Sequence, residues 1–209
     1  MNRKLRMYLR SVMLCCVLCL PARLSAEGVY QGFSGGMMVH LGYLYGNNAA
    51  ASITMNGGTM GIGGAARVHL LEHLRVGGEG YVSTLPVWMS AQHNTLATGS
   101  YVRNGWGGVL ADAYWRCDKV WPFVGATIGG GAQRALYIAE GSQNDWQEEP
   151  HALFHRQAYF MLDPFVGVEI AVSEHMHLTL RADYVLPIVR TGLLAPHGPR
   201  LYIGMMFCH

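Results

Sequence analysis

Residues 160–186, FMLDPFVGVEIAVSEHMHLTLRADYVL, constrain the fold more than any other part of the chain. Apart from a short polar break at 173–176, the even-numbered positions are uncharged, whereas the odd-numbered positions carry Asp163, Glu169, Arg181 and Asp183. Successive side chains of a β-strand point to opposite faces, so this period of two indicates two strands, each with one apolar and one polar face. The break is short enough for a hairpin turn, which predicts antiparallel neighbours.

This alternation has two opposite structural solutions. A soluble barrel places the apolar face inside, whereas a membrane barrel turns it outward toward lipid. The hairpin alone does not choose between them, so the choice depends on the rest of the chain.

Composition favours one domain with an unusually uncharged surface. A chain of 209 residues is long enough for an eight-stranded barrel. Charged residues make up 13%, against roughly 25% in an ordinary soluble domain, and 27 residues are glycine. The formal net charge of +2 is too small to indicate a nucleic-acid partner.

Residues 1–26 have the pattern of a secretory signal peptide, which leaves 27–209 as the barrel domain. Four basic residues between Arg3 and Arg10 precede an apolar core at 11–20, and Ala26 is a small residue suited to cleavage. The core has about half of the roughly 20 residues that a transmembrane helix needs. The mature chain keeps Cys117 and Cys208, which are expected at the periplasmic end, and their pairing is left open.

Eight segments of the mature chain share the alternation. They are predicted as strands at 35–46, 60–70, 74–83, 105–115, 120–132, 160–172, 177–186 and 201–207. The connections after the first, third, fifth and seventh segments are long, at 47–58, 84–104, 133–157 and 187–199, and the other three are short. Small outer-membrane barrels have short periplasmic turns and longer extracellular loops, so this asymmetry favours the membrane orientation.

The two faces of the predicted strands support the same choice. The apolar faces contain no Lys, Arg, Asp or Glu, and the other faces hold mostly Gly, Ala, Thr and Tyr with a few single charges. Such a sparse face suits the narrow interior of an eight-stranded barrel better than a surface in water. We therefore predict an all-β fold, an eight-stranded antiparallel up-and-down transmembrane β-barrel.

The chain resembles the small eight-stranded outer-membrane barrels, the family that includes OmpX, OmpW and the OmpA transmembrane domain. The resemblance rests on the signal peptide, PFVGATIGGG at 122–131, the hairpin described above, and RLYIGMMF at 200–207. It implies a monomer in the outer membrane of a Gram-negative-type cell, surrounded by lipid and lipopolysaccharide. It also implies that the barrel-assembly machinery reads the last strand, although here Phe207 is followed by two further residues.

Charged residues on the inward faces are the main candidate site. Arg67, Glu79, Asp112, Glu169 and Arg181 lie about four to seven residues into their strands from the short turns, so we expect one charged layer in the lumen. Further candidates for this layer are Asp183, Asp163, His69 and His177. The network is interpreted as a structural plug, with a gated ion or proton path as the alternative.

Catalytic and metal sites receive little support. His177 and Thr179 have spacing compatible with acyl chemistry, but they point inward. No catalytic residue, cofactor or metal is predicted. The loop histidines His93, His151, His155 and His197 match no defined metal site, and the loop aromatics Trp88, Trp146 and Phe154 are candidates for partner contact.

The predicted function is a structural or surface-interaction role through four long extracellular loops, with an extracellular partner. The alternative is a narrow pore or passive transporter of small or hydrophobic solutes, as the resemblance to OmpW implies. A third reading is an enzyme that modifies lipid A.

Overall fold

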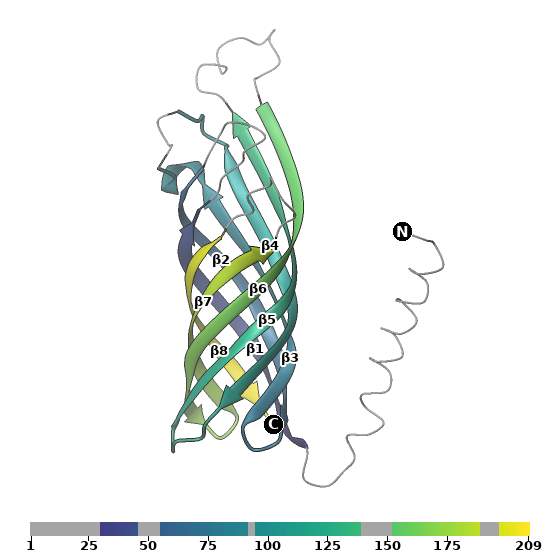
Figure 1. Cartoon of the computed structure of the whole chain (residues 1–209). Coiled ribbons are helices and arrows are strands. Elements are labelled where there is room, and N and C mark those ends of the chain that lie inside the picture. Colours follow the sequence, from purple (N-terminus) through teal and green to yellow (C-terminus); the bar gives the residue numbers. More distant parts are fainter. Residues whose placement is uncertain (1–29, 46–54, 92–94, 139–151, 189–196) are drawn as a thin grey trace, which may run out of the picture.

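The computed structural model describes residues 30–45, 55–91, 95–138, 152–188 and 197–209, so the predicted signal peptide lies outside the described residues. Eight antiparallel strands close into one barrel, in which each strand pairs with its neighbours in sequence and β1 pairs with β8 (Figure 1). The strands are β1 (Tyr30–Leu44), β2 (Gly57–Leu70), β3 (Leu74–Pro86), β4 (Tyr101–Tyr114), β5 (Val120–Ile138), β6 (Ala152–Ser173), β7 (Met176–Ile188) and β8 (Gly198–Cys208). The predicted fold class is confirmed.

The burial of the two faces decides the orientation of the barrel. Outward apolar side chains are exposed, including Met37 at 64% and Leu201 at 68%, whereas Arg67 and Asp163 on inward faces are fully buried. A soluble barrel would show the reverse, because water would then meet the charged face. The apolar belt therefore forms the outer wall, and lipid is the solvent that suits it.

Three short turns and the described chain ends lie at one end of the barrel (Figure 1). The N–H of Phe33 donates to the carbonyl of His209 at 2.8 Å, and the N–H of His209 returns the bond at 2.8 Å. By the rule for outer-membrane barrels, this is the periplasmic end and the long connections lie at the extracellular end. Among the described residues no helix is long and apolar enough to cross a bilayer.

Strands β2 to β8 all extend further toward the extracellular end than the alternation predicts. The largest error concerns the predicted connection at 133–157, because β5 has 19 residues, β6 has 22, and Gln133 pairs with Gln157. Polar residues occupy both faces there, with Gln133 and Gln157 inward and Arg134 and Arg156 outward, so the alternation alone predicts a loop. A membrane strand needs only about 9–11 residues to cross the hydrocarbon, so the polar parts of β5 and β6 extend beyond it.

Glycine on the inward faces makes room for large lumen side chains. A Cβ added at Gly131 would lie 2.5 Å from the ring of Tyr159, and one at Gly167 would lie 2.3 Å from the ring of Phe123. An eight-stranded barrel has just enough interior for its side chains, so each large ring needs a small residue beside it.

Candidate functional site

The lower charge cluster lies near the periplasmic end and contains Arg67, Arg75, Asp112 and Glu169 from β2, β3, β4 and β6. Arg67 Nη1 donates to Glu169 Oε1 at 2.6 Å and Arg75 Nη1 to Glu169 Oε2 at 2.7 Å. Arg75 Nε donates to Asp112 Oδ1 at 2.6 Å. All four side chains are fully buried, so two cations and two carboxylates compensate each other away from water.

The upper charge cluster is centred on one arginine. Arg181 Nη2 lies 3.0 Å from Glu79 Oε1 and 3.2 Å from both Asp163 Oδ2 and Asp183 Oδ2. Thr127 Oγ1 also donates to Glu79 Oε1 at 2.5 Å. A single guanidinium thus contacts three carboxylates. Glu79 lies on β3, Asp163 lies on β6, and Asp183 lies on β7, the same strand as Arg181.

Two phenylalanine rings separate these clusters. The ring centroids of Phe123 and Phe165 are 6.0 Å apart, the Arg67 guanidinium lies 5.1 Å from Phe123, and that of Arg181 lies 4.0 Å from Phe165. The expectation of one charged layer is therefore wrong. Barrel strands are tilted and staggered, so residues at similar distances from their turns lie at different heights.

The structure divides the predicted network between the two clusters. The lower cluster holds Arg67, Asp112 and Glu169, and the upper one holds Glu79, Arg181 and Asp183. Arg75 was missed, although it shares the inward face of β3 with Glu79. Its side chain is fully buried beside the turn between β2 and β3.

Aromatic rings fill the lumen above the upper cluster. His40 lies among the rings of Tyr81, Trp106 and Tyr202, with centroids 5.9, 5.4 and 4.9 Å away. The Arg200 guanidinium lies 4.0 Å from the Trp106 ring, a cation–π contact. These contacts leave the middle of the barrel packed with large buried side chains.

An apolar cap closes the extracellular mouth. Leu44, Leu85 and Val102 are buried in one cluster whose other members are Met55, Leu96, Ala135 and Tyr137. Part of the connection between β3 and β4 folds over this cluster, since the Ala97 N–H donates to the Ile138 carbonyl at 2.9 Å. The lumen is thus filled at both ends by chemically different groups.

The periplasmic end contains His177 and Thr179, whose spacing is compatible with acyl chemistry. His177 Nδ1 lies 3.7 Å from Glu169 Oε2 and 3.6 Å from Cys208 Sγ, while Thr179 is fully buried. Both His177 and Thr179 point into the lumen as expected, where no lipid can reach them. Cys117 is exposed at a turn, and both described cysteines are free thiols.

The predicted loop residues are dispersed. His93, His151 and Trp146 lie outside the described residues, and His155 and Phe154 belong to β6 instead of a loop. His197 accepts or donates a 2.9 Å hydrogen bond with the Tyr184 hydroxyl. In the described ranges no group of three or more His, Cys, Asp or Glu side chains is placed to hold a metal.

Comparison with known proteins identifies the fold. No protein-family model matches the chain, and no curated protein matches it in sequence. The chain is similar in structure to the crystal structure of Neisserial surface protein A, with 16% identity over 85% of this chain and 97% of that one and a TM-score of 0.55. It is also similar to Ail, the attachment invasion locus protein of Yersinia pestis, crystallised with the heparin analogue sucrose octasulfate. That match has 10% identity, covers 86% of this chain and 99% of Ail, and has a TM-score of 0.50.

These matches establish the fold of the small eight-stranded outer-membrane barrels, as the sequence resemblance implied.

Proposed function

We propose that the protein is an outer-membrane surface protein that acts through its extracellular rim, with the barrel as a closed anchor. The observation that carries this proposal is the filled lumen. Two buried charge clusters occupy the periplasmic half, and the apolar cap occupies the extracellular mouth. In this proposal the charge clusters have a structural role, and the function lies outside the lumen.

The rim offers exposed aromatic side chains for a partner. Trp88 is 69% exposed on a short 3-10 turn, η2 (Val87–Met89), and Phe154 is 61% exposed on the extended part of β6. The η2 segment is held in place, because the Ala91 N–H donates to the Asn56 carbonyl at 2.8 Å. Exposed apolar groups on a fixed support are typical of contact surfaces. The names of the two similar proteins, a surface protein and an attachment protein, agree with such a role.

The other functions have less support. A narrow pore or passive transporter would need a path past Arg67 and Arg181, whose ion pairs fill the lumen. A lipid A-modifying enzyme would need His177 and Thr179 at the lipid or the rim, and both are enclosed. Recognition of the last strand by the barrel-assembly machinery, and the monomeric state, stay predictions.

A matched pair of double variants tests the rim. Cells that express the wild-type chain are compared with W88A/F154A and with W115A/W121A, which changes two aromatic residues near the periplasmic end. Attachment to cultured epithelial cells is measured, together with the heat-dependent gel mobility of each barrel. We expect W88A/F154A to lose most of the attachment gained over empty-vector cells and the control to keep it. Equal attachment by all strains, empty-vector cells included, would overturn the proposal.

A further inference from the structure

Three arginines lie side by side on the outer wall. Arg103 of β4 pairs in register with Arg134 of β5, which pairs with Arg156 of β6, and all three are exposed. We call them the arginine row. Residues paired across neighbouring strands lie about 5 Å apart, so the row spans roughly 10 Å. It lies near the extracellular ends of the three strands.

The arginine row contains every charged residue on the outward faces of the described strands. Like charges directly opposite each other on neighbouring strands repel and destabilise the sheet. Within the described ranges none of the three forms an ion pair, and the exposed carboxylates Glu72, Asp118 and Glu174 lie at the periplasmic turns. This arrangement favours a negatively charged ligand supplied from outside the described chain.

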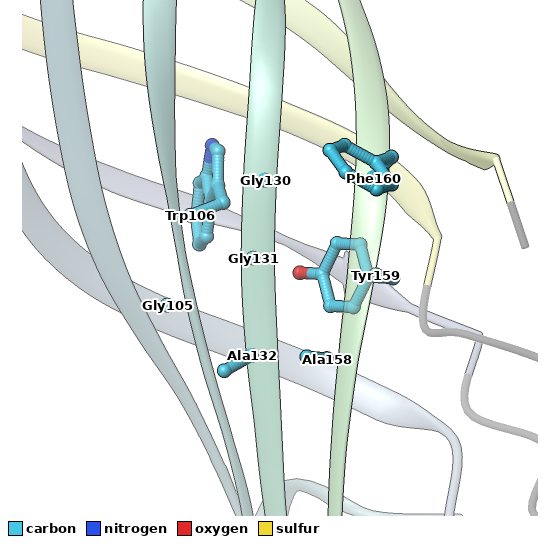
Figure 2. Close-up of a pocket in the computed structure, with 8 residues that line it drawn as sticks. All are labelled: Gly105, Trp106, Gly130, Gly131, Ala132, Ala158, Tyr159 and Phe160. Atoms are coloured by element: carbon cyan, nitrogen blue, oxygen red, sulfur yellow. The ribbon is translucent and has the colours of Figure 1, made fainter. Parts of the chain in front are cut away.

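A depression of about 580 Å³ borders the arginine row. Gly105, Ala132 and Ala158 form the next outward row toward the apolar belt, and Phe160, which is 76% exposed, is part of the lining. Figure 2 shows that Gly130, Gly131 and Ala132 of β5 lie between Trp106 on one side and Tyr159 and Phe160 on the other. Because these glycine and alanine residues have at most a methyl side chain, the outer wall has an apolar hollow here.

The barrel itself does not require glycine in this hollow. A Cβ added at Gly130 would meet nothing closer than the Tyr159 carbonyl oxygen at 3.4 Å, and one at Gly105 nothing closer than the Tyr81 carbonyl oxygen at 3.8 Å. On the inward face, by contrast, a Cβ at Gly131 would clash with Tyr159 at 2.5 Å. The outward small residues thus shape the outer surface instead of permitting internal packing.

We propose that the arginine row and the hollow bind one phosphorylated glycolipid of the outer leaflet, the lipid A part of lipopolysaccharide. Guanidinium groups bind phosphate oxygens through paired charge-assisted hydrogen bonds, and a row of three can hold more than one phosphate. One acyl chain lies in the hollow against Phe160, where it buries apolar surface. A soluble polyanion would use the arginines but would have no use for an apolar hollow facing the membrane.

The test measures lipid retention by the refolded barrel. Full-length mature protein in detergent micelles is titrated with diphosphoryl lipid A, phosphatidylglycerol or sucrose octasulfate, and bound ligand is counted by native mass spectrometry. R134Q/R156Q is compared with R116Q/K119Q, which removes the same charge at the periplasmic end. G130V, which fills the hollow, is compared with G78V, at an outward glycine outside it.

We expect one lipid A per wild-type barrel, bound more tightly than phosphatidylglycerol. R134Q/R156Q lowers the affinity for lipid A at least about tenfold, since each arginine supplies charge-assisted hydrogen bonds to phosphate. G130V lowers the affinity several-fold. Both controls bind as the wild type does. Equal binding of phosphatidylglycerol with no effect of R134Q/R156Q would overturn the proposal in favour of unspecific annular lipid. Tight binding of sucrose octasulfate that G130V leaves unchanged would overturn the proposal in favour of a soluble polyanion. A barrel that retains no lipid A would also overturn the proposal.

Discussion

Arg181 of β7 reaches across the lumen to Glu79 of β3, where both of its terminal nitrogens donate to the same carboxylate. The same guanidinium also holds Asp163 and Asp183 at 3.2 Å. One guanidinium thus contacts three buried acids. The upper cluster is therefore much more sensitive to loss of the arginine than to loss of any one carboxylate.

Arg181→Met is expected to destabilise the refolded barrel by about 3–5 kcal/mol, because three buried carboxylates lose their common cation. Glu79→Gln should cost less, since Arg181 keeps two carboxylate partners. Urea unfolding followed by gel mobility of unboiled samples measures both free energies. Equal costs for the two variants would contradict the assignment of Arg181 as the centre of the cluster.

The two arginines of the lower cluster should differ in importance. Arg75 makes two short bonds, of 2.6 and 2.7 Å, whereas Arg67 makes one at 2.6 Å and a longer contact of 3.6 Å to Asp112. Arg75→Met should therefore lower the free energy of unfolding more than Arg67→Met. A double-mutant cycle of each arginine with Asp112→Asn gives the coupling free energy between that arginine and Asp112. A larger coupling free energy for Arg67 than for Arg75 would contradict the distances above.

Neighbouring glycines on β5 provide a test of the lumen packing. Gly131→Val forces a side chain into the Tyr159 ring and displaces its hydroxyl from Asn104, at an expected cost of about 1–3 kcal/mol. Gly130→Val points outward, where its Cβ would meet nothing closer than the Tyr159 carbonyl oxygen at 3.4 Å, and should change stability by less than about 0.5 kcal/mol. The two unfolding curves are compared under identical conditions. A larger loss at Gly130 would mean that the faces of β5 are reversed.

The sequence predicted the faces of the strands because the alternation is strict within the hydrocarbon. Leu180 and Arg181 of β7, for example, lie on the outward and inward faces as expected. Beyond the hydrocarbon polar residues lie on both faces, so the sequence predicts a loop where the segments around Gln133 and Gln157 are paired. The arginine row was missed for the same reason, since only the strand register brings Arg103, Arg134 and Arg156 together.

The candidate site was predictable in its residues but not in its arrangement. The alternation of the two strand faces places Glu79 and Glu169 on the inward side, as lumen residues. It does not give their heights, because these depend on the tilt and stagger of the closed barrel. The separation by Phe123 and Phe165 and the apolar cap over the mouth likewise arise from contacts between distant strands.

Thiol labelling tests the orientation of the barrel. Cys117 is exposed at the periplasmic turn between β4 and β5, and Cys208 is half-buried at the end of β8. In intact cells a membrane-impermeant maleimide should label neither thiol, and after permeabilisation of the outer membrane it should label Cys117 faster. A cysteine introduced by Trp88→Cys should react in intact cells. Labelling of Cys117 from outside would invert the assignment of the two ends.

Single-channel recording of the refolded wild-type barrel tests the closed lumen most directly. Samples are first checked for heat-dependent gel mobility, so that only folded barrels enter the planar bilayer. The buried charge clusters and the apolar cap predict a folded barrel that inserts without conductance steps. Regular, reproducible steps from the folded wild-type protein, altered by Glu79→Gln or Arg181→Met, would contradict the closed lumen and establish a pore.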